Sequence, residues 1–426
     1  MCGVYGIYNK LERIDNNELN QLERRMIFRG PDDHGRFINQ NLGIGMRRLS
    51  IIDIKNGKQP MTNTNMDIQL VYNGEIYNFV ELRESLKKKG YVFSTGTDTE
   101  VLLNMYAEYG KDCISKLNGM FGFCIYDKGL KELWIARDRL GIKPLFYYHD
   151  ENKFIFSSEL VGISKVINAN ISKNSILDYL SYSYVPSPNS IYENIYKLEP
   201  GEELIFNLEK FSIYKNRYWK LDNQENYKKD TNVNKINNIL LNSVKSQMVS
   251  DVPVGVFLSG GLDSSIIASY ASLAQDKPIN TFTINFQGKE SQDKKYADLV
   301  SNKIMSNHYE IKVDSKSQLK ELDNLLYYMD EPMSDSAIIP TYLISKLAHE
   351  TGIKVILSGA GADEIFAGYP RHFPKKFATA AWFANLAKIL RITFSNLIGI
   401  YNPSYKYRFF NSARNFASNI SGINYK

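Results

Sequence analysis

Two parts of the sequence carry residue types that could do chemistry. The first is Cys2, which becomes the first residue of the chain if the initiator methionine is removed. Its thiol then lies beside a free α-amine, whose pKa of roughly 7.7–8.0 suits it to take up the thiol proton. This is the arrangement of an N-terminal nucleophile, which needs no separate catalytic histidine. A small residue after methionine is common by chance, so Cys2 alone is a weak signal.

The second part is a glycine-rich segment, Ser259-Gly260-Gly261-Leu262-Asp263-Ser264-Ser265. It follows an apolar run over 252–258 and opens a stretch with helical spacing. Backbone N–H groups and a helix dipole would then face one point, which is an arrangement that binds phosphate. No lysine follows the glycines as in the GxxxxGKS/T loop, so transfer of a γ-phosphate is disfavoured. A tight turn without a ligand is the alternative interpretation.

The elements around these residues divide the chain in two. Before about residue 208, β-branched and aromatic runs predict strands at 2–8, 68–72, 121–126, 133–136 and 153–156, with helices at 17–28 and 78–89. A polar stretch over 207–234 follows as a linker. Beyond it, strands and helices alternate, which predicts a parallel sheet covered by helices. A length of 426 residues also favours two domains, here 2–208 and 233–426.

Composition excludes several other classes of protein. The chain is 43% hydrophobic and 23% charged, as in folded globular domains. Its 52 basic and 46 acidic residues are scattered, which favours a solvated surface over a nucleic-acid patch. Three cysteines without metal-ligand spacing, and no leader before Cys2, favour a reduced, cytoplasmic protein. The most apolar stretch, 377–401, is broken by Lys388 and Arg391, which predicts a partly buried helix and not a membrane span.

Further motifs place Cys2 in a familiar pattern. They are Arg29-Gly30-Pro31-Asp32, Arg48-Leu49-Ser50-Ile51, Asn73-Gly74-Glu75-Ile76-Tyr77-Asn78, Thr97-Asp98-Thr99-Glu100, Gly119-Met120-Phe121-Gly122-Phe123, Arg137-Asp138-Arg139-Leu140-Gly141-Ile142-Lys143-Pro144-Leu145 and Ser157-Ser158-Glu159. In this order they resemble the class II glutamine amidotransferase domain of asparagine synthetases. The glycine-rich segment resembles the pyrophosphate loop of ATP pyrophosphatases. The resemblance implies an α+β N-terminal nucleophile domain with four αββα layers, followed by an α/β parallel-sheet pyrophosphate-loop domain.

The resemblance assigns roles in the first domain. Cys2 would attack the side-chain amide of glutamine, and the Asn73 amide with the Gly74 backbone N–H would form the oxyanion hole. Charged side chains would hold the two ends of the amino acid, the α-carboxylate by Arg48 and the α-ammonium by Glu75 and Asp98. Taken without Cys2, the Asn73-Gly74 pair is most simply a hairpin turn, and Arg48 and Asp98 are surface charges.

The resemblance also assigns an ATP site in the second domain. Its residues would be Leu258, Ser259, Gly260, Gly261, Asp263, Ser264, Thr283, Ser358 and Gly359. Asp263 and Asp363 would hold Mg²⁺ against the leaving pyrophosphate. The segments 330–332 and 334–336 resemble the lining of the acyl-acceptor pocket. The alternative for these acids is an ordinary helix cap.

The activity that follows is that of an ATP-dependent carbon–nitrogen ligase, asparagine synthase. In the family, aspartate reacts with ATP to give β-aspartyl-AMP and pyrophosphate, and ammonia released from glutamine converts the adenylate to asparagine. The resemblance therefore implies glutamine, aspartate and ATP as substrates and Mg²⁺ as the metal. It implies no nucleic-acid or membrane partner, and leaves a homodimer open.

Two departures from the family pattern qualify this expectation. The relatives carry an acid at the position of Ala360, and a Lys-Xaa-Asp stretch and a Glu-Xaa-Arg-Xaa-Pro-Phe-Leu-Asp stretch beyond the position of Arg371 that the sequence up to Lys426 lacks. We therefore expect a complete glutaminase with a weak or inactive synthetase. Two alternatives stay open: amidation of another carboxylate, as in surface-polysaccharide biosynthesis, and a glutaminase-only or regulatory form.

Overall fold

The first part of the chain forms two antiparallel sheets in the computed structural model, which describes residues 1–221, 232–286, 292–366 and 368–369. One sheet contains β1 (Gly3–Asn9), β2 (Asp33–Asn39), β3 (Leu42–Arg48), β8 (Phe146–His149), β9 (Lys153–Ser157) and β10 (Ile195–Lys197). The other contains β4 (Met61–Thr62), β5 (Ile68–Ile76), β6 (Gly119–Asp127), β7 (Glu132–Arg137), β11 (Glu202–Asn207) and β12 (Ser212–Arg217). Their strand orders are β10-β8-β9-β1-β3-β2 and β12-β11-β7-β6-β5-β4.

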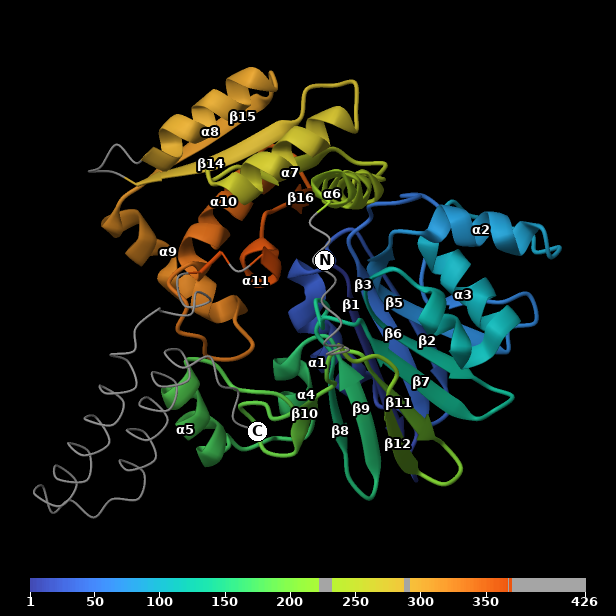
Figure 1. Ribbon diagram of the computed structural model, residues 1–426. Helices are drawn as coiled ribbons and strands as arrows, with labels where there is room; N and C mark the ends of the chain where they lie inside the picture. The colour runs from blue at the N-terminus through green and yellow to red at the C-terminus, as the bar shows by residue number, and fades with distance from the viewer. Residues whose placement is uncertain (222–231, 287–291, 367, 370–426) are drawn as a thin grey trace, which may run out of the picture.

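Helices cover the outer face of each sheet. They are α1 (Asn16–Arg24), the 3₁₀ helix η1 (Arg25–Phe28), α4 (Leu160–Val166) and α5 (Lys173–Tyr182) beside the first sheet, and α2 (Phe79–Lys87), α3 (Asp98–Tyr109) and η2 (Gly110–Lys116) beside the second. Because strand side chains alternate between faces, Val4 and Cys124 meet in the core between the sheets. Their neighbours Tyr5 and Phe123 pack outward with the helices. The predicted αββα layering is confirmed (Figure 1).

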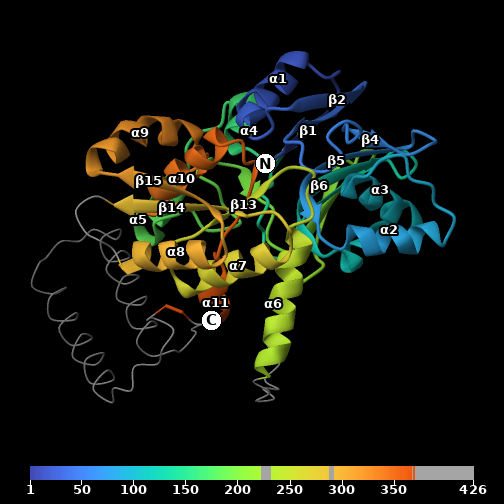
Figure 2. The ribbon, with the colours of Figure 1, turned by 90° about the horizontal axis from the view of Figure 1, so that it is seen from above.

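The second part of the chain contains a parallel sheet. Its strands are β13 (Val254–Phe257), β14 (Asn280–Phe286), β15 (Asn307–Val313) and β16 (Val355–Leu357), in the order β15-β14-β13-β16. Its helices are α6 (Val233–Gln247), α7 (Leu262–Leu273), α8 (Gln292–Lys303), α9 (Ser315–Tyr328), α10 (Ile338–Glu350) and α11 (Ala362–Phe366). Figure 2 shows α7 and α8 on one face of the sheet and α9 and α10 on the other, which confirms the predicted α/β arrangement.

The two parts meet along a shared boundary at which the N-terminus lies (Figures 1 and 2). Lys354 pairs with Asp32 across it at 2.7 Å, and the carboxylate of Asp251 accepts the Asp53 N–H at 2.7 Å. Residues 222–231, within the predicted linker, and the apolar stretch 377–401 lie outside the described residues. These contacts hold the first part of the chain against the part that contains the parallel sheet.

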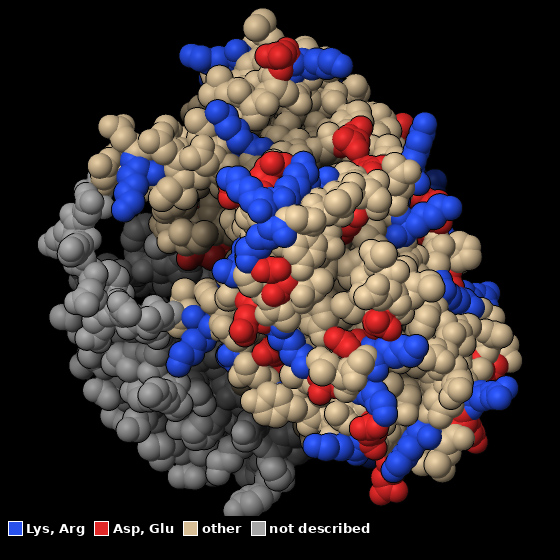
Figure 3. All heavy atoms as spheres, turned by 90° about the vertical axis from the view of Figure 1, so that its right-hand side faces the viewer, with Lys and Arg blue, Asp and Glu red and all other residues tan. Residues whose placement is uncertain are grey.

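The described surface mixes charges of both signs. On the face shown in Figure 3, basic and acidic side chains intermingle without a large area of one sign. Within residues 1–221, 232–286 and 292–366, no helix has the length and apolar character needed to cross a bilayer.

Candidate active site

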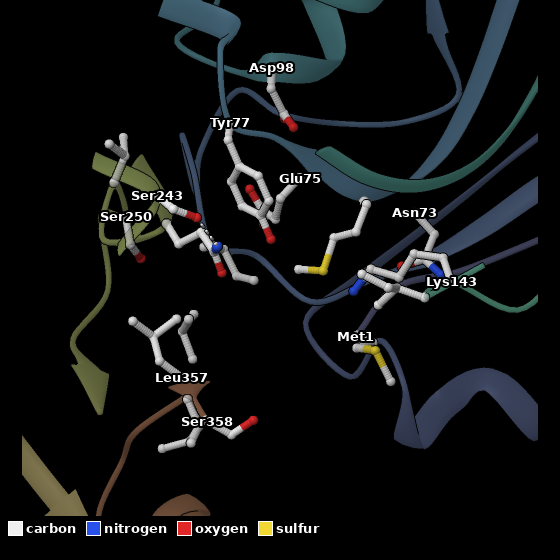
Figure 4. Close-up of a pocket in the computed structure, with 18 of the residues that line it drawn as sticks. Met1, Asn73, Glu75, Tyr77, Asp98, Lys143, Ser243, Ser250, Leu357 and Ser358 are labelled. Atoms are coloured by element: carbon white, nitrogen blue, oxygen red, sulfur yellow. Dashed lines mark hydrogen bonds between the residues drawn. The ribbon is translucent and has the colours of Figure 1, made fainter. Parts of the chain in front are cut away.

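A cavity of about 930 Å³ lies where the two parts meet. Its lining includes predicted site residues from both parts, namely Cys2, Arg48, Asn73, Gly74, Glu75, Asp98, Ser358 and Gly359. In Figure 4, Asn73 and Glu75 lie on the side of the first part, and Ser243, Leu357 and Ser358 lie across the hollow from them. The fold therefore brings the predicted glutamine residues into one space and joins that space to part of the predicted nucleotide segment.

Cys2 lies directly before β1, which pairs with β3 on one side and β9 on the other. Its sulfur accepts the Leu49 N–H, with 3.3 Å between Sγ and N, and its carbonyl accepts a bond from Arg29 Nε at 3.2 Å. Burial of the thiol raises its pKa above the ordinary value. A thiol in this place therefore needs a nearby base in order to react at neutral pH.

An amino group lies close to that thiol. It belongs to Met1 in this chain and donates to the Arg29 carbonyl at 3.0 Å. Burial lowers the pKa of this amine to about 5, so it is mostly uncharged at pH 7 and free to accept a proton. Hydrolysis of the peptide bond between Met1 and Cys2 would instead free the α-amine of Cys2 itself.

Asn73 and Gly74 lie inside β5 and face Gly122 and Phe121 of β6. The alternative interpretation of this pair as a hairpin turn is therefore wrong. Asn73 is 1% exposed, and its Nδ2 has no hydrogen-bond partner among the described residues. Because a buried amide left unpaired is costly, this donor is available to a molecule bound in the cavity. A side chain at Gly74 would bring its Cβ within 2.4 Å of the Met120 carbonyl oxygen.

Glu75, which is half-buried, and Asp98, which is buried, form an acidic pair near the same strand. Asp98 is the first residue of α3, after Thr97, whose hydroxyl accepts the Glu100 N–H at 3.1 Å. The Oδ2 atom of Asp98 accepts hydrogen bonds from the Tyr72 hydroxyl at 2.7 Å and from the Ile76 N–H at 3.0 Å. Burial raises the pKa of Asp98, while burial and then the charge of Asp98 raise the pKa of Glu75. A cationic group bound here would stabilise the ionised form of both carboxyls and so lower their pKa values.

Arg48 is held by a loop of the first part. Its Nη2 donates to the carbonyls of Ile52 and Asp53 at 2.9 Å, and its Nη1 donates to the Ile54 carbonyl at 3.1 Å. The guanidinium also passes so close to Gly57 that a Cβ there would lie 2.1 Å from Nη2. Arg48 and Asp98 are each only 5% exposed, so the alternative of two surface charges is wrong.

Lys143 also lines the cavity, although the sequence assigned it no role. Asp138 accepts three amides of its loop, from Leu140, Ile142 and Lys143. Arg137 donates to the Lys143 carbonyl at 2.8 Å, so the two charged residues fix this loop. Burial lowers the pKa of the Lys143 ammonium, and the negative charges of Glu75 and Cys2 oppose that change. In the sequence, Lys143 is visible only as one lysine within the motif 137–145. Its place in the cavity depends on residues that are distant along the chain.

The pyrophosphate-loop segment lies between β13 and α7, as the sequence predicted. Gly260 has a φ of 85°, a left-handed conformation that favours glycine, and a Cβ there would lie 1.9 Å from the Asp293 carbonyl oxygen. The Ser264 hydroxyl accepts the Ser259 N–H at 3.2 Å. The turn is therefore tight, and it leads directly into α7, whose N-cap is Gly261.

The remaining predicted nucleotide residues surround this loop. The Thr283 hydroxyl donates to the carbonyl of Leu258, and a Cβ on Gly359 would lie 2.9 Å from the Ser264 backbone nitrogen. The segment that carries Ser358 and Gly359 therefore touches the beginning of α7. Asp363 lies in the first turn of α11, which follows this segment.

The predicted Mg²⁺ ligands Asp263 and Asp363 lie in the first turns of α7 and α11. Within the described part of the chain, no cluster of three or more His, Cys, Asp or Glu side chains could hold a metal. Two carboxylates, of Asp263 and Asp363, suit Mg²⁺, which usually keeps several waters and shares phosphate oxygens with its substrate.

Comparison with known proteins agrees with this geometry. A model of the glutamine amidotransferase domain matches residues 1–219, and a model named asparagine synthase matches residues 235–418. A Methanocaldococcus jannaschii protein provisionally named glutamine-hydrolyzing asparagine synthetase 2 is 39% identical over 422 residues, covering 93% of this chain and 81% of that protein. The chain belongs to the glutamine-hydrolysing asparagine synthetase family.

Other members of the asparagine synthetase family are longer than the matched region. Asparagine synthetase 1 of Bacillus subtilis is 36% identical, and the match covers 87% of this chain and 59% of that protein. Asparagine synthetase B of Escherichia coli is 33% identical, with coverages of 87% and 65%. A solved glutamine phosphoribosylpyrophosphate amidotransferase from B. subtilis aligns over 84% of this chain and 91% of its own, at 15% identity and a TM-score of 0.41. This structural similarity is too low to support an argument, so the fold is assigned from the strand orders of the three sheets.

Proposed function

We propose that this chain releases ammonia from glutamine at Cys2 and uses it, with ATP, to convert aspartate to asparagine. The observation that carries the proposal is the cavity, which is lined by Cys2 and Asn73 at one end and by Ser358 and Gly359 at the other. A space shared by a candidate nucleophile and a nucleotide segment suits a reaction in which one half supplies a reagent to the other.

Glutamine hydrolysis would begin once Met1 is removed and the amine belongs to Cys2. The amine takes the thiol proton, and the sulfur attacks the γ-carbonyl carbon of glutamine. The negative charge on the carbonyl oxygen is met by Asn73 Nδ2 and the Gly74 N–H. The C–N bond then breaks, the nitrogen takes the proton from the amine, and ammonia leaves. Water hydrolyses the remaining thioester to glutamate and restores the thiol.

Two charged regions would select glutamine. Arg48 presents a planar guanidinium to the α-carboxylate. The Glu75 and Asp98 carboxyls, whose pKa values burial raises, would receive the α-ammonium and become ionised as it binds. Together with the donors at Asn73 and Gly74, these contacts would bind glutamine at three points.

The second reaction would occur at the pyrophosphate loop. The aspartate β-carboxylate attacks the α-phosphorus of ATP, pyrophosphate leaves, and ammonia then attacks the β-carbonyl carbon and expels AMP. The amides around Gly260 and the beginning of α7 would hold the leaving pyrophosphate. Asp263 and Asp363 would hold Mg²⁺, which would offset negative charge on the phosphates.

The shared cavity would shelter ammonia between the two reactions. Part of its lining is apolar and comes from several elements, including Ile52, Leu240, Val244, Ile267 and Ile356. An apolar lining disfavours the charged ammonium and leaves neutral ammonia, the nucleophilic form, unprotonated.

ATP as a substrate and free cysteines both favour the cytoplasm as the location of the protein.

A second candidate changes only the acceptor. Ala360, where the family pattern has an acid, lines the cavity beside Gly359. A small, uncharged side chain there leaves room for a carboxylate other than aspartate. Supplying candidate acids and identifying the amide formed separates the two proposals.

The test of the proposed function follows the nitrogen atom. The purified chain is incubated with glutamine labelled with ¹⁵N in its side-chain amide, together with ATP, Mg²⁺ and aspartate. The expected result is abundant glutamate and a smaller amount of labelled asparagine, because the synthetase is expected to be weak, with AMP and pyrophosphate formed in equal amounts. Glutamate without any labelled amide product would contradict the ligase proposal and support a glutaminase-only form.

Arg48→Met is expected to lower kcat/KM for glutamine hydrolysis by roughly 10- to 100-fold, because hydrogen bonds to charged groups contribute about 1.5–3 kcal/mol. The loss should fall mainly on KM, which steady-state kinetics resolve. Arg48→Lys is the matched variant, since it keeps the charge but loses the planar fork. An unchanged KM in both variants would remove Arg48 from the glutamine site.

A further inference from the structure

The loop after α9 carries two carboxylates that reach across to the first part of the chain. Asp330 accepts the Leu160 N–H at 2.8 Å and the Val161 N–H at 3.3 Å, and these are the first two residues of α4. Glu331 accepts the Ile191 N–H at 2.8 Å and pairs with Lys197 at 2.6 Å. Both carboxylates therefore contact the first part, although their segment resembles the lining of an acceptor pocket.

Of these two carboxylates, Asp330 is the one whose neighbours lead to the proposed nucleophile. Glu159, which is 6% exposed, directly precedes α4 and pairs with Arg29 at 2.7 Å. Arg29 in turn donates to the Cys2 carbonyl at 3.2 Å, and its own carbonyl accepts the amino group at the beginning of the chain. One chain of polar contacts thus runs from the second part, through Glu159 and Arg29, to the carbonyl of Cys2 and the amino group of Met1.

The charges along this route depend on one another. The ionisable groups that face Glu159 are Arg29, directly after η1, and Asp330, on the loop after α9. Burial first, and then the negative charge of Asp330, raise the pKa of Glu159 to about 7. At lower pH a proton offsets the repulsion between the two carboxyls. As the pH rises from the ordinary pKa of a glutamate toward 7 and above, Glu159 loses its proton. The repulsion between Glu159 and Asp330 then appears and weakens the contact between Asp330 and α4.

We propose that Asp330 is a positioning residue for glutamine hydrolysis, acting through Glu159 and Arg29 on the backbone of Cys2. The inference rests on the proposed role of Cys2 as the nucleophile. It assigns the second part of the chain a function in the first reaction: its loop fixes the geometry in which the thiol attacks.

The test compares Asp330→Asn with Lys197→Met in the full chain. Asparagine keeps the size of the side chain and one acceptor but removes its charge. Lys197→Met breaks the neighbouring contact of the same loop, the ion pair with Glu331, without touching Glu159. Glutamine hydrolysis is measured from pH 5.5 to 9, on the order of two pH units either side of the Glu159 transition.

Asp330→Asn is expected to lower kcat about 10-fold with little change in KM, the size of effect that loss of one charged hydrogen bond gives. The transition near pH 7 should also move down by about 1 unit, because a neighbouring negative charge has been removed. Lys197→Met should change neither quantity. Glu159→Gln, which removes the titrating group itself, should abolish the transition.

Three outcomes decide the matter. Equal losses in Asp330→Asn and Lys197→Met would show that the loop merely joins the two parts, and would overturn the proposal. An unchanged kcat and pH profile in Asp330→Asn would do the same. A wild-type chain without glutaminase activity would instead refute the proposed function on which the inference rests. Thermal unfolding of each variant confirms that it is folded.

Discussion

Cys2→Ala is expected to abolish glutamine hydrolysis, with kcat falling at least about 10³-fold, as when the nucleophile of other acyl-transfer enzymes is removed. The reason is chemical: an alanine side chain cannot form the thioester, and the remaining donors around Asn73 can only polarise the amide. Release of glutamate, measured with a coupled dehydrogenase assay, provides the readout.

The other cysteines supply the control for that experiment. Cys113 and Cys124 are fully buried in the cores on either face of the second sheet. Cys113→Ala is expected to retain glutamine hydrolysis, and iodoacetamide is expected to label Cys2 alone in the folded chain. Mass spectrometry of the purified protein also reveals whether Met1 has been removed. Full activity in Cys2→Ala, or in material that retains Met1, would refute the nucleophile assignment.

Asn73→Ala is expected to lower kcat for glutamine hydrolysis by about 10²–10³-fold, the effect of removing one oxyanion-hole donor. KM should change little, because the donor acts on charge that develops during the reaction. Exposed Asn118, which lies just before β6, provides a matched amide for removal. Asn118→Ala should leave kcat within about two-fold, as surface substitutions usually do.

Asn73→Asp sharpens this prediction because it keeps the shape of the side chain. A carboxylate at this position would repel the developing oxyanion, so its kcat should fall at least as far as that of Asn73→Ala. Activity near the wild-type level in Asn73→Asp would mean that the unpaired Nδ2 serves another purpose than the oxyanion. The free energy of unfolding, measured in urea, separates lost catalysis from lost folding.

Much of the fold follows from local patterns. The elements predicted at 2–8, 68–72 and 78–89 correspond to β1, β5 and α2, with ends that differ by a few residues, and the helical stretch predicted after the glycine-rich segment corresponds to α7. Runs of β-branched and aromatic residues located β1 and β5, which are buried on both faces, and apolar residues that share one side located α2. The alternation of strands with helices after residue 233 likewise predicted the parallel sheet.

Helix α3 escaped the sequence analysis for a physical reason. Six consecutive residues from Asp98 to Leu103 are all buried, so the helix has no polar side from which a 3.6-residue period could be recognised. Its first residue, Asp98, was predicted as a ligand for an ammonium group without the helix that positions it. A short apolar stretch with acidic residues does not identify its own secondary structure.

The sequence predicted the individual residues of the candidate site, but it did not predict the cavity that they line. Cys2, Asn73 and Arg48 come from three strands or strand ends that only the finished sheets bring together. The Asn73-Gly74 pair shows the difficulty, since the same dipeptide is a common hairpin turn and here lies within a long strand. Lys143 and Asp330 depend on contacts between distant parts of the chain, which no local pattern encodes.

The position of Met1 has a practical consequence for producing the protein. Its side chain lines the cavity, and its nitrogen is bonded to Arg29. Any affinity tag or fusion partner joined there would thread through the space proposed for glutamine and would leave an amide where the free amine is needed. Recombinant chains are best tagged at their other end, or released by a protease whose cut exposes the cysteine.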